Sequence, residues 1–324
     1  MVKVIIIDKT GSAEVLKYVN HNIGEPKDDE VLIKHTAIGL NRYDLECRNG
    51  MRKNKKLPAV LGVEAVGVIE RLGKDVEVFN VGDRVGYCTV SGGAYSEKRL
   101  IKQKYLVRIP DDITDQVAAA VLFKGMTAHY LTHLVYAIRP NTFALVHGAT
   151  GGVGQILCQW ASYKGCKVIG VISSDDRANI ALRAGCSYVV NNNSKNFVEQ
   201  IMEITHGSGV NVVYDCIGDL ASKVSFESLC MFGIYVSYGQ ISGPISNVSA
   251  SMLSSRSLFF TSPLVFHYKR SSFDLAMTAM ELFEVIRRNY IKVGINKIYK
   301  FGDIVTAHQD LENRKLTGSN IIEL

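Results

Sequence analysis

The sequence lacks the long apolar run that a membrane-spanning helix requires, since no stretch approaches about 18 uninterrupted apolar residues. The N-terminal run Val4–Ile7 ends at Asp8 and is too short for the core of a signal peptide. The seven cysteines are scattered and form no Cys-x-x-Cys pair, so neither a disulfide framework nor a cysteine metal cluster follows from them. We therefore expect a soluble, cytoplasmic protein whose thiols stay reduced.

With 324 residues the chain is long enough for two domains. Its apolar fraction of 47% and charged fraction of 21% are ordinary for a globular protein. The net charge of +6 is spread along the chain, apart from the cluster Arg52-Lys53-Asn54-Lys55-Lys56. This cluster either decorates a solvated loop or contacts an anion or a nucleic acid.

The first third of the chain reads as many short strands separated by glycine-rich turns, which is typical of a compact β-barrel-like domain. The expected strands are Val2–Asp8, Glu30–Leu40, Ala65–Leu72, Arg84–Cys88 and Tyr95–Ile101. The segment Val81-Gly82-Asp83-Arg84-Val85 reads as a structural turn that leads into a strand.

From Asp115 onward the pattern changes to helices and then to strands that alternate with helices. Such alternation predicts an α/β domain with a parallel, doubly wound sheet. Expected helices are Ala118–Val121, Ala128–Leu134, Asn196–Thr205 and Ser272–Arg288; expected strands are Lys167–Ile172, Tyr188–Val190, Val210–Tyr214, Gly233–Ser237, Ser257–Thr261, Ile291–Val293, Lys297–Lys300 and Asn320–Glu323. The last three strands could rejoin the N-terminal domain.

The stretch Ala144–Gly154 stands out, because an apolar strand runs into Gly148-Ala149-Thr150-Gly151-Gly152-Val153-Gly154 and then into a helix. This order matches the dinucleotide-binding pattern, with Ala149 in place of the first glycine. Backbone N–H groups at such a turn suit a pyrophosphate. Read by itself, the motif could also be an ordinary tight loop.

The end of the next strand indicates which dinucleotide is bound. Ser173, Ser174 and Arg177 follow Lys167–Ile172, where NAD-preferring proteins carry an acidic residue. Hydroxyls and a guanidinium suit a 2′-phosphate, so the pattern favours NADP over NAD. Asp175 and Asp176 complicate this reading, unless they cap a helix, and Arg177 could be a solvated helix residue.

Loops that follow later strands should face the same cofactor. Asp215-Cys216-Ile217-Gly218 and Tyr238-Gly239 come directly after expected strand ends. Ligands of parallel sheets lie outside the carboxyl ends of the strands.

The ordered motifs resemble those of the zinc-free, ζ-crystallin-like quinone oxidoreductases of the medium-chain dehydrogenase/reductase superfamily. They are Gly39-Leu40-Asn41-x-x-Asp44, Leu61–Val68, Val81–Val85, Lys124–Ala128 and Gly148–Gly154. The resemblance covers nearly the whole chain. It implies a Rossmann NADPH-binding domain at 123–264 and a GroES-like β-barrel catalytic domain formed by 1–122 and 265–324.

The resemblance also implies roles for particular residues. Asn41 and Asp44 would belong to the substrate and nicotinamide pocket as catalytic residues, with Thr127 near the nicotinamide ribose. Gly151, Gly152 and Val153 would hold the pyrophosphate, and Ser173, Arg177 and Arg314 would meet the 2′-phosphate. Glu46 and Arg52 stand where a close relative carries tyrosines that line the pocket, so a more polar pocket mouth is expected. Asn192 stands where a related enzyme carries a tyrosine against the adenine ribose.

Alternatives remain for three of these residues. Asn41 could only bridge backbone groups, Asp44 could only cap a helix, and Lys124 could satisfy carbonyls or touch the cofactor. Zinc alcohol dehydrogenases of the superfamily carry cysteine and histidine where this chain has Asn41 and Val63. An amide and a valine cannot replace those ligands, so no metal is expected.

The resemblance predicts an NADPH-dependent quinone oxidoreductase in which Asn41 donates a hydrogen bond to the oxygen that gains charge. The rival hypotheses are an enone or 2-alkenal reductase, and a non-catalytic NADPH-binding or RNA-binding protein for which Arg52–Lys56 is the only favourable feature. No membrane partner is expected. The apolar segment Ser257–Thr261 predicts a homodimer through the Rossmann domains.

Overall fold

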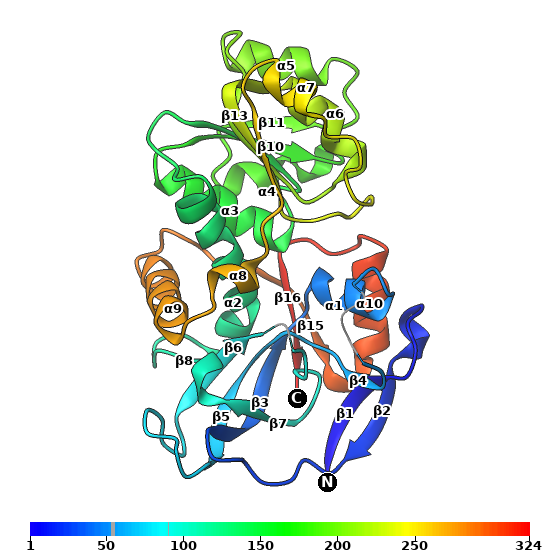
Figure 1. The fold of residues 1–324 in the computed structure, drawn as a ribbon, viewed down its shortest axis with the longest axis vertical. Helices are drawn as coiled ribbons and strands as arrows, with labels where there is room; N and C mark the ends of the chain where they lie inside the picture. Colours follow the sequence, from blue (N-terminus) through cyan, green and yellow to red (C-terminus); the bar gives the residue numbers. More distant parts are fainter. Residues whose placement is uncertain (53–55, 90) are drawn as a thin grey trace. The chain divides into compact units, whose positions relative to one another are not determined.

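The computed structural model describes residues 1–52, 56–89 and 91–324. The chain divides into two compact units, each with its own sheet (Figure 1). Unit 1 comprises Met1–Met126, Lys269–Arg288 and Val293–Leu324, and unit 2 comprises Thr127–Tyr268 and Asn289–Lys292. The boundaries expected from the sequence, after residues 122 and 264, fall slightly before these changes.

Unit 1 is built mainly on antiparallel pairing, and only β15 and β16 of the described strands pair in parallel. One sheet has the order β15-β16-β3-β5-β6-β8, with β7 also paired to β3, and a small sheet has the order β2-β1-β4. Its strands are β1 Val2–Ile7, β2 Lys17–His21, β3 Glu30–Gly39, β4 Ala59–Val60, β5 Glu64–Leu72, β6 Arg84–Cys88, β7 Lys98–Lys102, β8 Leu106–Arg108, β15 Ile295–Lys300 and β16 Ser319–Glu323. These pairings do not close into a ring, so the expected barrel stays a prediction.

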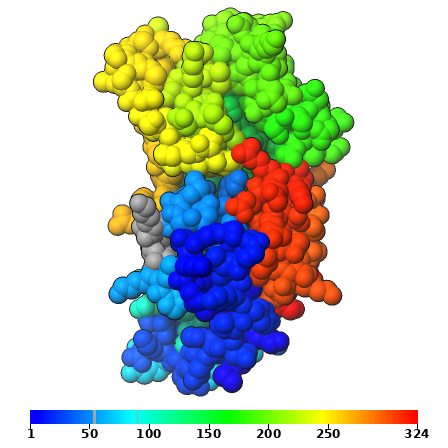
Figure 2. Space-filling model, turned by 90° about the vertical axis from the view of Figure 1, so that its right-hand side faces the viewer, coloured from blue at the N-terminus to red at the C-terminus, as the bar shows by residue number. Residues whose placement is uncertain are grey.

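The two ends of the chain meet in unit 1. β16 pairs with β3, with Ile322 opposite Ile38. In Figure 2 the N-terminal segments, in blue, lie side by side with the C-terminal segments, in orange and red. The helices of this unit are α1 Arg42–Arg48, most of α2 Asp115–Tyr130, α9 Ser272–Arg287 and α10 Ile304–Glu312, with short 3-10 turns at Ala13–Val15, Gln103–Tyr105 and Phe301–Asp303.

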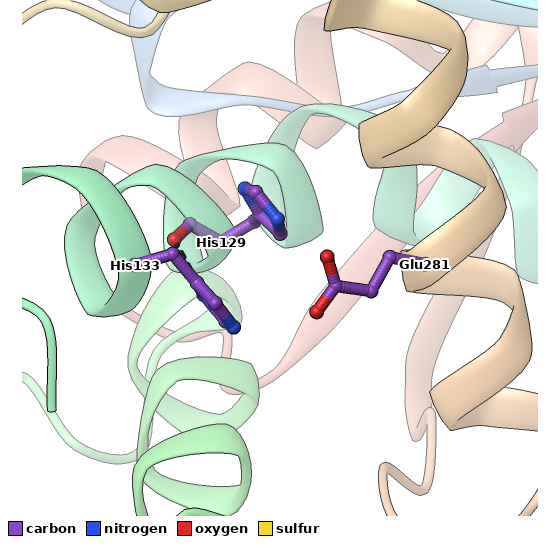
Figure 3. A group of neighbouring side chains, drawn as sticks. All are labelled: His129, His133 and Glu281. Atoms are coloured by element: carbon purple, nitrogen blue, oxygen red, sulfur yellow. Dashed lines mark hydrogen bonds between the residues drawn. The ribbon is translucent and has the colours of Figure 1, made fainter. Parts of the chain in front are cut away.

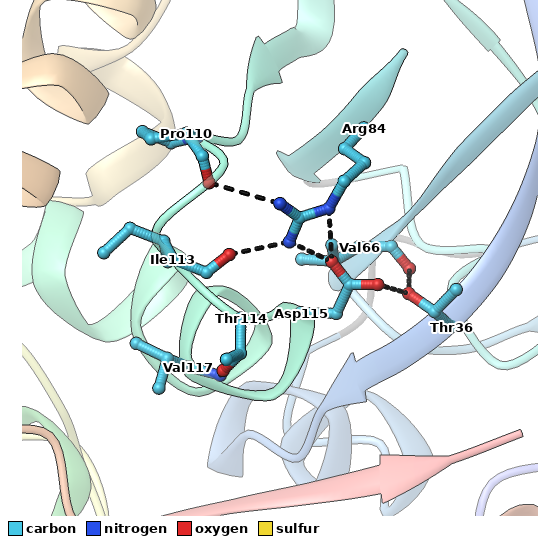
Figure 4. Close-up of polar contacts among 8 residues, drawn as sticks. All are labelled: Thr36, Val66, Arg84, Pro110, Ile113, Thr114, Asp115 and Val117. Carbon is cyan, nitrogen blue, oxygen red and sulfur yellow. Dashed lines mark hydrogen bonds and ion pairs between the residues drawn. The ribbon is translucent and has the colours of Figure 1, made fainter. Parts of the chain in front are cut away.

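The start of α2 is fixed to the sheet of unit 1 by one ion pair and its neighbours (Figure 4). Arg84 of β6 donates to Asp115 at 2.5 Å and to the carbonyls of Ile113 and Pro110 at 2.6 and 3.2 Å. Thr36 of β3 donates to the second oxygen of Asp115 at 2.7 Å. The helix therefore leaves the sheet from a fixed point, which matters because α2 carries Lys124 and Thr127.

Unit 2 has one sheet in the order β11-β10-β9-β12-β13-β14, and its pairings are all parallel. Its strands are β9 Phe143–His147, β10 Lys167–Ile172, β11 Tyr188–Asn191, β12 Val210–Asp215, β13 Leu229–Ser237 and β14 Phe259–Thr261. Its helices are the end of α2, a π-helical turn Leu131–Val135, α3 Gly152–Tyr163, a 3-10 turn Asp175–Arg177, α4 Ala178–Arg183, α5 Phe197–Ile204, α6 Asp219–Glu227, α7 Ala250–Ser254 and α8 Val265–Tyr268.

Continuous apolar strands form the core of unit 2, as expected for a parallel sheet covered by helices. Leu145 of β9, Ile169 of β10 and Val213 of β12 are fully buried and pack with Phe197 and Ile201 of α5. The Rossmann sheet predicted from the alternation of strands and helices is thus confirmed. It begins with β9 at the centre and places the turn Gly148–Gly151 at the carboxyl end of that strand.

Most predicted elements agree with the structure. The strands Arg84–Cys88 and Lys167–Ile172 are confirmed with the same bounds, and the late helix is confirmed as α9, whose Ser271 caps the N–H of Asp274.

Other predictions were wrong. Ala118–Val121 and Ala128–Leu134 are not separate helices, because α2 runs through both and continues into the π-helical turn. Tyr95 lies outside β7, and Ile291–Val293 forms no strand.

The prediction missed elements whose burial does not follow a simple period. β2 is polar, with only Val19 half-buried, because it pairs with β1 alone. α1 has the sequence RYDLECR, yet six of its seven residues are buried by tertiary packing. No described helix combines the length and apolarity needed to cross a bilayer. Of the basic cluster, Lys53, Asn54 and Lys55 lie outside the described residues.

Candidate functional site

The glycine-rich turn of unit 2 has the shape that a phosphate cradle needs. Gly148 adopts a φ of +67°, and its carbonyl accepts a hydrogen bond from Gly151 N at 2.9 Å. A Cβ on Gly154 would lie 2.0 Å from that same carbonyl oxygen, so only glycine lets α3 start this close to the turn. The first N–H groups of α3, from Gly152 and Val153 onward, have no acceptor within the helix. They suit the pyrophosphate of a dinucleotide.

The end of β10 supplies a polar surface for the adenosine end of such a ligand. Ser173 is exposed, and Ser174 and Arg177 are half-buried. The carboxylate of Asp175 accepts a hydrogen bond from Asn191 at 2.7 Å, and the amide of Asn193 donates to Ser173 O at 3.2 Å. Since Asp175 is engaged by Asn191 and the strand itself ends at Ile172, the arrangement fits a 2′-phosphate better than a free ribose diol.

Asp176 and Asp175 do not cap the helix through their side chains. They stand in the first turn of the 3-10 segment Asp175–Arg177, and its N-cap residue is Ser174. An acidic first turn is favourable at a helix N-terminus.

Two loops at the carboxyl ends of β12 and β13 are locked together by Asp215, which is fully buried. Its carboxylate accepts hydrogen bonds from the N–H groups of Ile217 and Gly218 at 2.7 and 2.9 Å and from the Tyr235 hydroxyl at 2.6 Å. Its carbonyl accepts from Tyr238 N at 2.8 Å. Burial raises the pKa of the Tyr238 hydroxyl well above its usual range. Tyr238 is thus held as a neutral phenol at the edge of the sheet where a nucleotide would lie.

In unit 1 the residue Asn41 is the N-cap of α1 and is buried. Its amide nitrogen donates to Glu64 Oε2 at 2.7 Å and is 3.4 Å from Gly39 O. Both N–H groups of the amide therefore face acceptors of the protein, one on Glu64 and one on Gly39. A donor role of Asn41 toward a substrate oxygen stays a prediction and would require the contact with Gly39 O to open.

Glu64 is fully buried, and the contacts of its carboxylate among the described residues are with hydrogen-bond donors or a positive charge. Phe123 N donates to its Oε1 at 2.6 Å, and the ammonium of Lys124 lies 3.6 Å from its Oε2. Burial raises the pKa of the Glu64 carboxyl, while Lys124 and the Asn41 amide act in the opposite direction. In the sequence, Glu64 stands out only as part of the motif Leu61–Val68. Nothing local to its sequence shows that residues 41, 123 and 124 meet it.

Asp44 lies inside the first turn of α1 and is buried. Its carboxylate accepts from the Tyr95 hydroxyl at 3.3 Å, and that hydroxyl lies 2.9 Å from His308 Nε2. Burial lowers the pKa of His308 to about 3 and raises that of Tyr95 well above its usual range. Tyr95 and His308 were not anticipated. They orient Asp44 through contacts between segments far apart in the chain.

The remaining expected residues lie as follows. Thr127 is buried in α2 at the first position of unit 2. Arg314 is exposed, directly after α10, and belongs to unit 1. Glu46 and Arg52 form an ion pair at 2.7 Å, and the Arg52 guanidinium lies over the ring of Tyr43 at 4.4 Å.

Two histidines at the end of α2 form a stacked pair in unit 2 (Figure 3). The rings of His129 and His133 lie 4.4 Å apart and meet Trp160 edge-on. His133 Nδ1 is 2.9 Å from His129 O, as in an ordinary helix-capping contact. Figure 3 also draws Glu281, which lies on α9 of unit 1.

Family models match both units. Residues 27–111 match the alcohol dehydrogenase GroES-like domain, and residues 152–283 match a family described as zinc-binding dehydrogenase.

The chain is 37% identical over 323 residues to a quinone oxidoreductase of Pseudomonas aeruginosa, with 99% of each chain covered. It is 33% identical to a 2-haloacrylate reductase of a Burkholderia species, again with 99% of each covered. Among solved structures it is similar to the quinone oxidoreductase of Escherichia coli complexed with NADPH, at a TM-score of 0.96 and 35% identity, covering 99% of this chain and 100% of that one.

Proposed function

The chain belongs to the zinc-free quinone oxidoreductases of the medium-chain dehydrogenase/reductase superfamily, and on that premise we propose that it reduces a quinone with NADPH. The observation that carries the proposal is the match along the whole chain to an enzyme of this name solved with NADPH. When bound, NADPH supplies a hydride with its electron pair. The chain itself binds both reactants, orients them and excludes water.

The residues of unit 2 support NADPH as the cofactor. The N–H groups at Gly151, Gly152 and Val153 would hold the pyrophosphate, where Gly154 lets the helix start close to the turn. Ser173, Ser174 and Arg177 would bind the 2′-phosphate, with Arg314 of unit 1 as a further cation. Thr127 and Tyr238 would meet the nicotinamide half.

Asn41 and Asp44 would line the substrate side in unit 1. Asn41 presents its oxygen, because its nitrogen is held by Glu64. Asp44 is held by Tyr95 at 3.3 Å. Neither side chain is free to rotate without breaking a buried hydrogen bond, so both are preorganised rather than adaptable.

Steady-state assays test the proposal directly. We expect NADPH oxidation with 1,4-benzoquinone or 9,10-phenanthrenequinone, and weaker binding of NADH than of NADPH. An enzyme that oxidises NADPH with none of the quinones offered, or that binds NADH as tightly as NADPH, contradicts it.

The similarity to a 2-haloacrylate reductase makes an enone or 2-alkenal reductase the second candidate. Activity on 2-alkenals above that on quinones would decide for the second candidate.

We also propose a homodimer formed through unit 2. β14 is the edge strand of the sheet, and Phe259 on it is 59% exposed, with Met231 and Phe232 of β13 at 63% and 66%. An unpaired edge flanked by exposed apolar side chains is a typical association surface.

A reducing compartment such as the cytoplasm suits the thiols. All seven cysteines are free, and five of them are buried.

A further inference from the structure

The ammonium of Lys124 is buried in unit 1 and has no hydrogen-bond partner among the residues that the structure describes. Its side chain is 6% exposed. The nearest carboxylate oxygen, Glu64 Oε2, lies at 3.6 Å, which allows attraction between the charges but not a hydrogen bond. A buried ammonium without hydrogen bonds is unfavourable in the free protein. The N–H donors that do not face Glu64 are therefore available to a ligand.

A carboxylate faces the lysine. The neighbours of the Glu64 carboxylate are an amide nitrogen of Asn41, the N–H of Phe123 and the Lys124 ammonium, all of which donate or carry positive charge. These contacts oppose the effect of burial, which raises the pKa of the Glu64 carboxyl. Gly39 leaves the room that this arrangement needs, because a Cβ there would lie 2.0 Å from Glu64 Oε2.

The lysine lies among the residues expected to contact the substrate. Glu64, which it faces, holds Asn41. Asp44, Glu64 and Lys124 also act on one thiol, that of Cys88, whose pKa is raised by burial and by the two carboxylates and lowered by the ammonium. Of these groups, Lys124 is the one with donors to spare, because the two N–H groups of Asn41 face Glu64 Oε2 and Gly39 O and the carboxylates only accept.

We propose that Lys124 is a catalytic residue whose ammonium binds the carbonyl oxygen of the quinone and protonates it during reduction, with Glu64 as the residue that positions it. The inference rests on the proposed function and deepens it. In this proposal Lys124, and not Asn41, donates the hydrogen bond to the substrate oxygen.

A hydride from NADPH would supply two electrons and one hydrogen, which forms an O–H bond at one quinone oxygen and leaves the other oxygen as an anion, while the cofactor becomes NADP⁺. The ammonium of Lys124 loses an N–H bond as that oxygen gains an O–H bond, which gives the hydroquinone. The neutral amine then takes a proton from water.

Kinetics of Lys124→Met test the donor role. We expect kcat with 1,4-benzoquinone to fall about 100-fold or more, as is usual for loss of a positioned acid. The NADPH Kd, measured by quenching of protein fluorescence, should stay unchanged. Lys98→Met is the matched control, because Lys98 pairs with Glu70 on the surface of unit 1. It should behave as the wild type.

A probe that needs no turnover gives a second readout. 4-Nitrophenol resembles the product with its oxygen ready to ionise, and its phenolate is yellow. With enzyme saturated by NADP⁺, we expect the wild type and Lys98→Met to bind it as the phenolate. Lys124→Met should bind the colourless phenol or fail to bind the probe.

The double variant Lys124→Met/Glu64→Gln keeps the test valid if the single variant does not fold, because it removes both buried charges together. It should fold and show the same loss of kcat and of bound phenolate. A Lys124 variant with wild-type kcat and phenolate binding overturns the inference, as does one that weakens only NADPH binding. Absence of quinone reduction in the wild type would instead contradict the proposed function.

Discussion

Arg177 lies where unit 2 would distinguish NADPH from NADH. It follows Ser173 and Ser174 at the end of β10, and Asp175 beside it is turned to Asn191 at 2.7 Å. A half-buried guanidinium next to exposed hydroxyls can bind a doubly charged phosphate, which a ribose hydroxyl cannot replace.

Replacement of this arginine should therefore weaken the binding of NADPH but not that of NADH. For Arg177→Ala we expect the Kd for NADPH to rise about 10-fold or more, since a charge-assisted hydrogen bond contributes about 1.5–3 kcal/mol. The Kd for NADH should not change. Fluorescence titration measures both, and Arg183→Ala, an exposed arginine of α4, is the control. Equal losses for the two cofactors would contradict a phosphate-binding role.

Two buried imidazoles in unit 1 make the stability of the protein depend on pH. Burial lowers the pKa of His308 to about 3 and that of His35 to about 4, from the usual value of 6.5. Each histidine is neutral in the folded state and takes up a proton more readily when unfolded. Their stabilising contribution is complete above pH 6.5 and is lost as the pH falls towards the folded-state values.

We expect the free energy of unfolding to fall between pH 6.5 and about 4, by about 3 kcal/mol for each histidine shifted by this amount. Urea unfolding at several pH values measures the slope. In His35→Gln, which loses the bonds of the imidazole to Ser96 O and Tyr87, stability at neutral pH should be lower, but its decline in acid should be shallower. An unchanged slope in that variant would contradict the assignment.

At the scale of elements, α2 connects the sheet of unit 1 to the first residue of unit 2. Its start is held by Arg84 and Asp115, whose side chains are only 27% and 22% exposed. Lys124 and Thr127 follow on the same helix, so the ion pair fixes the position of the helix that carries them. Partly buried pairs that also bind backbone carbonyls stabilise more than surface pairs.

Arg84→Met should lower the free energy of unfolding by about 2–3 kcal/mol, because Asp115 and two carbonyls lose a donor. Lys102→Met breaks an ion pair with Asp29 whose side chains are 49% and 46% exposed, and should cost about 0–1 kcal/mol. Chemical denaturation measures both variants. Similar losses would mean that the anchor of α2 is no stronger than a surface pair.

The turn before α3 offers a second test at this scale. In Gly154→Ala the new Cβ would meet Gly148 O at 2.0 Å, so the turn must open, and we expect NADPH affinity to fall at least about 10-fold. Gly294→Ala, where nothing lies within 4 Å, is the control. Isothermal titration measures the affinity, and wild-type binding by Gly154→Ala would contradict the cradle.

At the scale of the whole molecule, the sheet of unit 2 ends at β14, and the exposed apolar side chains of β13 and β14 gather at that end. If two copies pair there, Phe259→Lys should give a monomer at micromolar concentration, while the wild type is a dimer by analytical ultracentrifugation. Leu220→Lys, a residue of α6 that is 82% exposed, should remain dimeric. A monomeric wild type would contradict the proposal.

The sequence predicts the two units of the molecule to different extents. Strands such as Lys167–Ile172 were found with the same bounds because a strand buried on both faces is apolar throughout. The α1 helix was missed because its burial comes from partners elsewhere in the chain. For the same reason the site was predicted only in part. Asn41 was singled out, but the direction of its amide depends on Glu64, twenty-three positions away.

The space around Gly39 leaves no room for a side chain. A side chain there would fall on the buried carboxylate of Glu64 and, at 2.6 Å, on the carbonyl of Ala119. Even alanine at position 39 would displace the acid at position 64, and with it the counter-charge of Lys124, and loss of the acid would not relieve the contact with Ala119 O. When codon 39 is randomised and active clones are selected, the survivors should therefore keep the glycine.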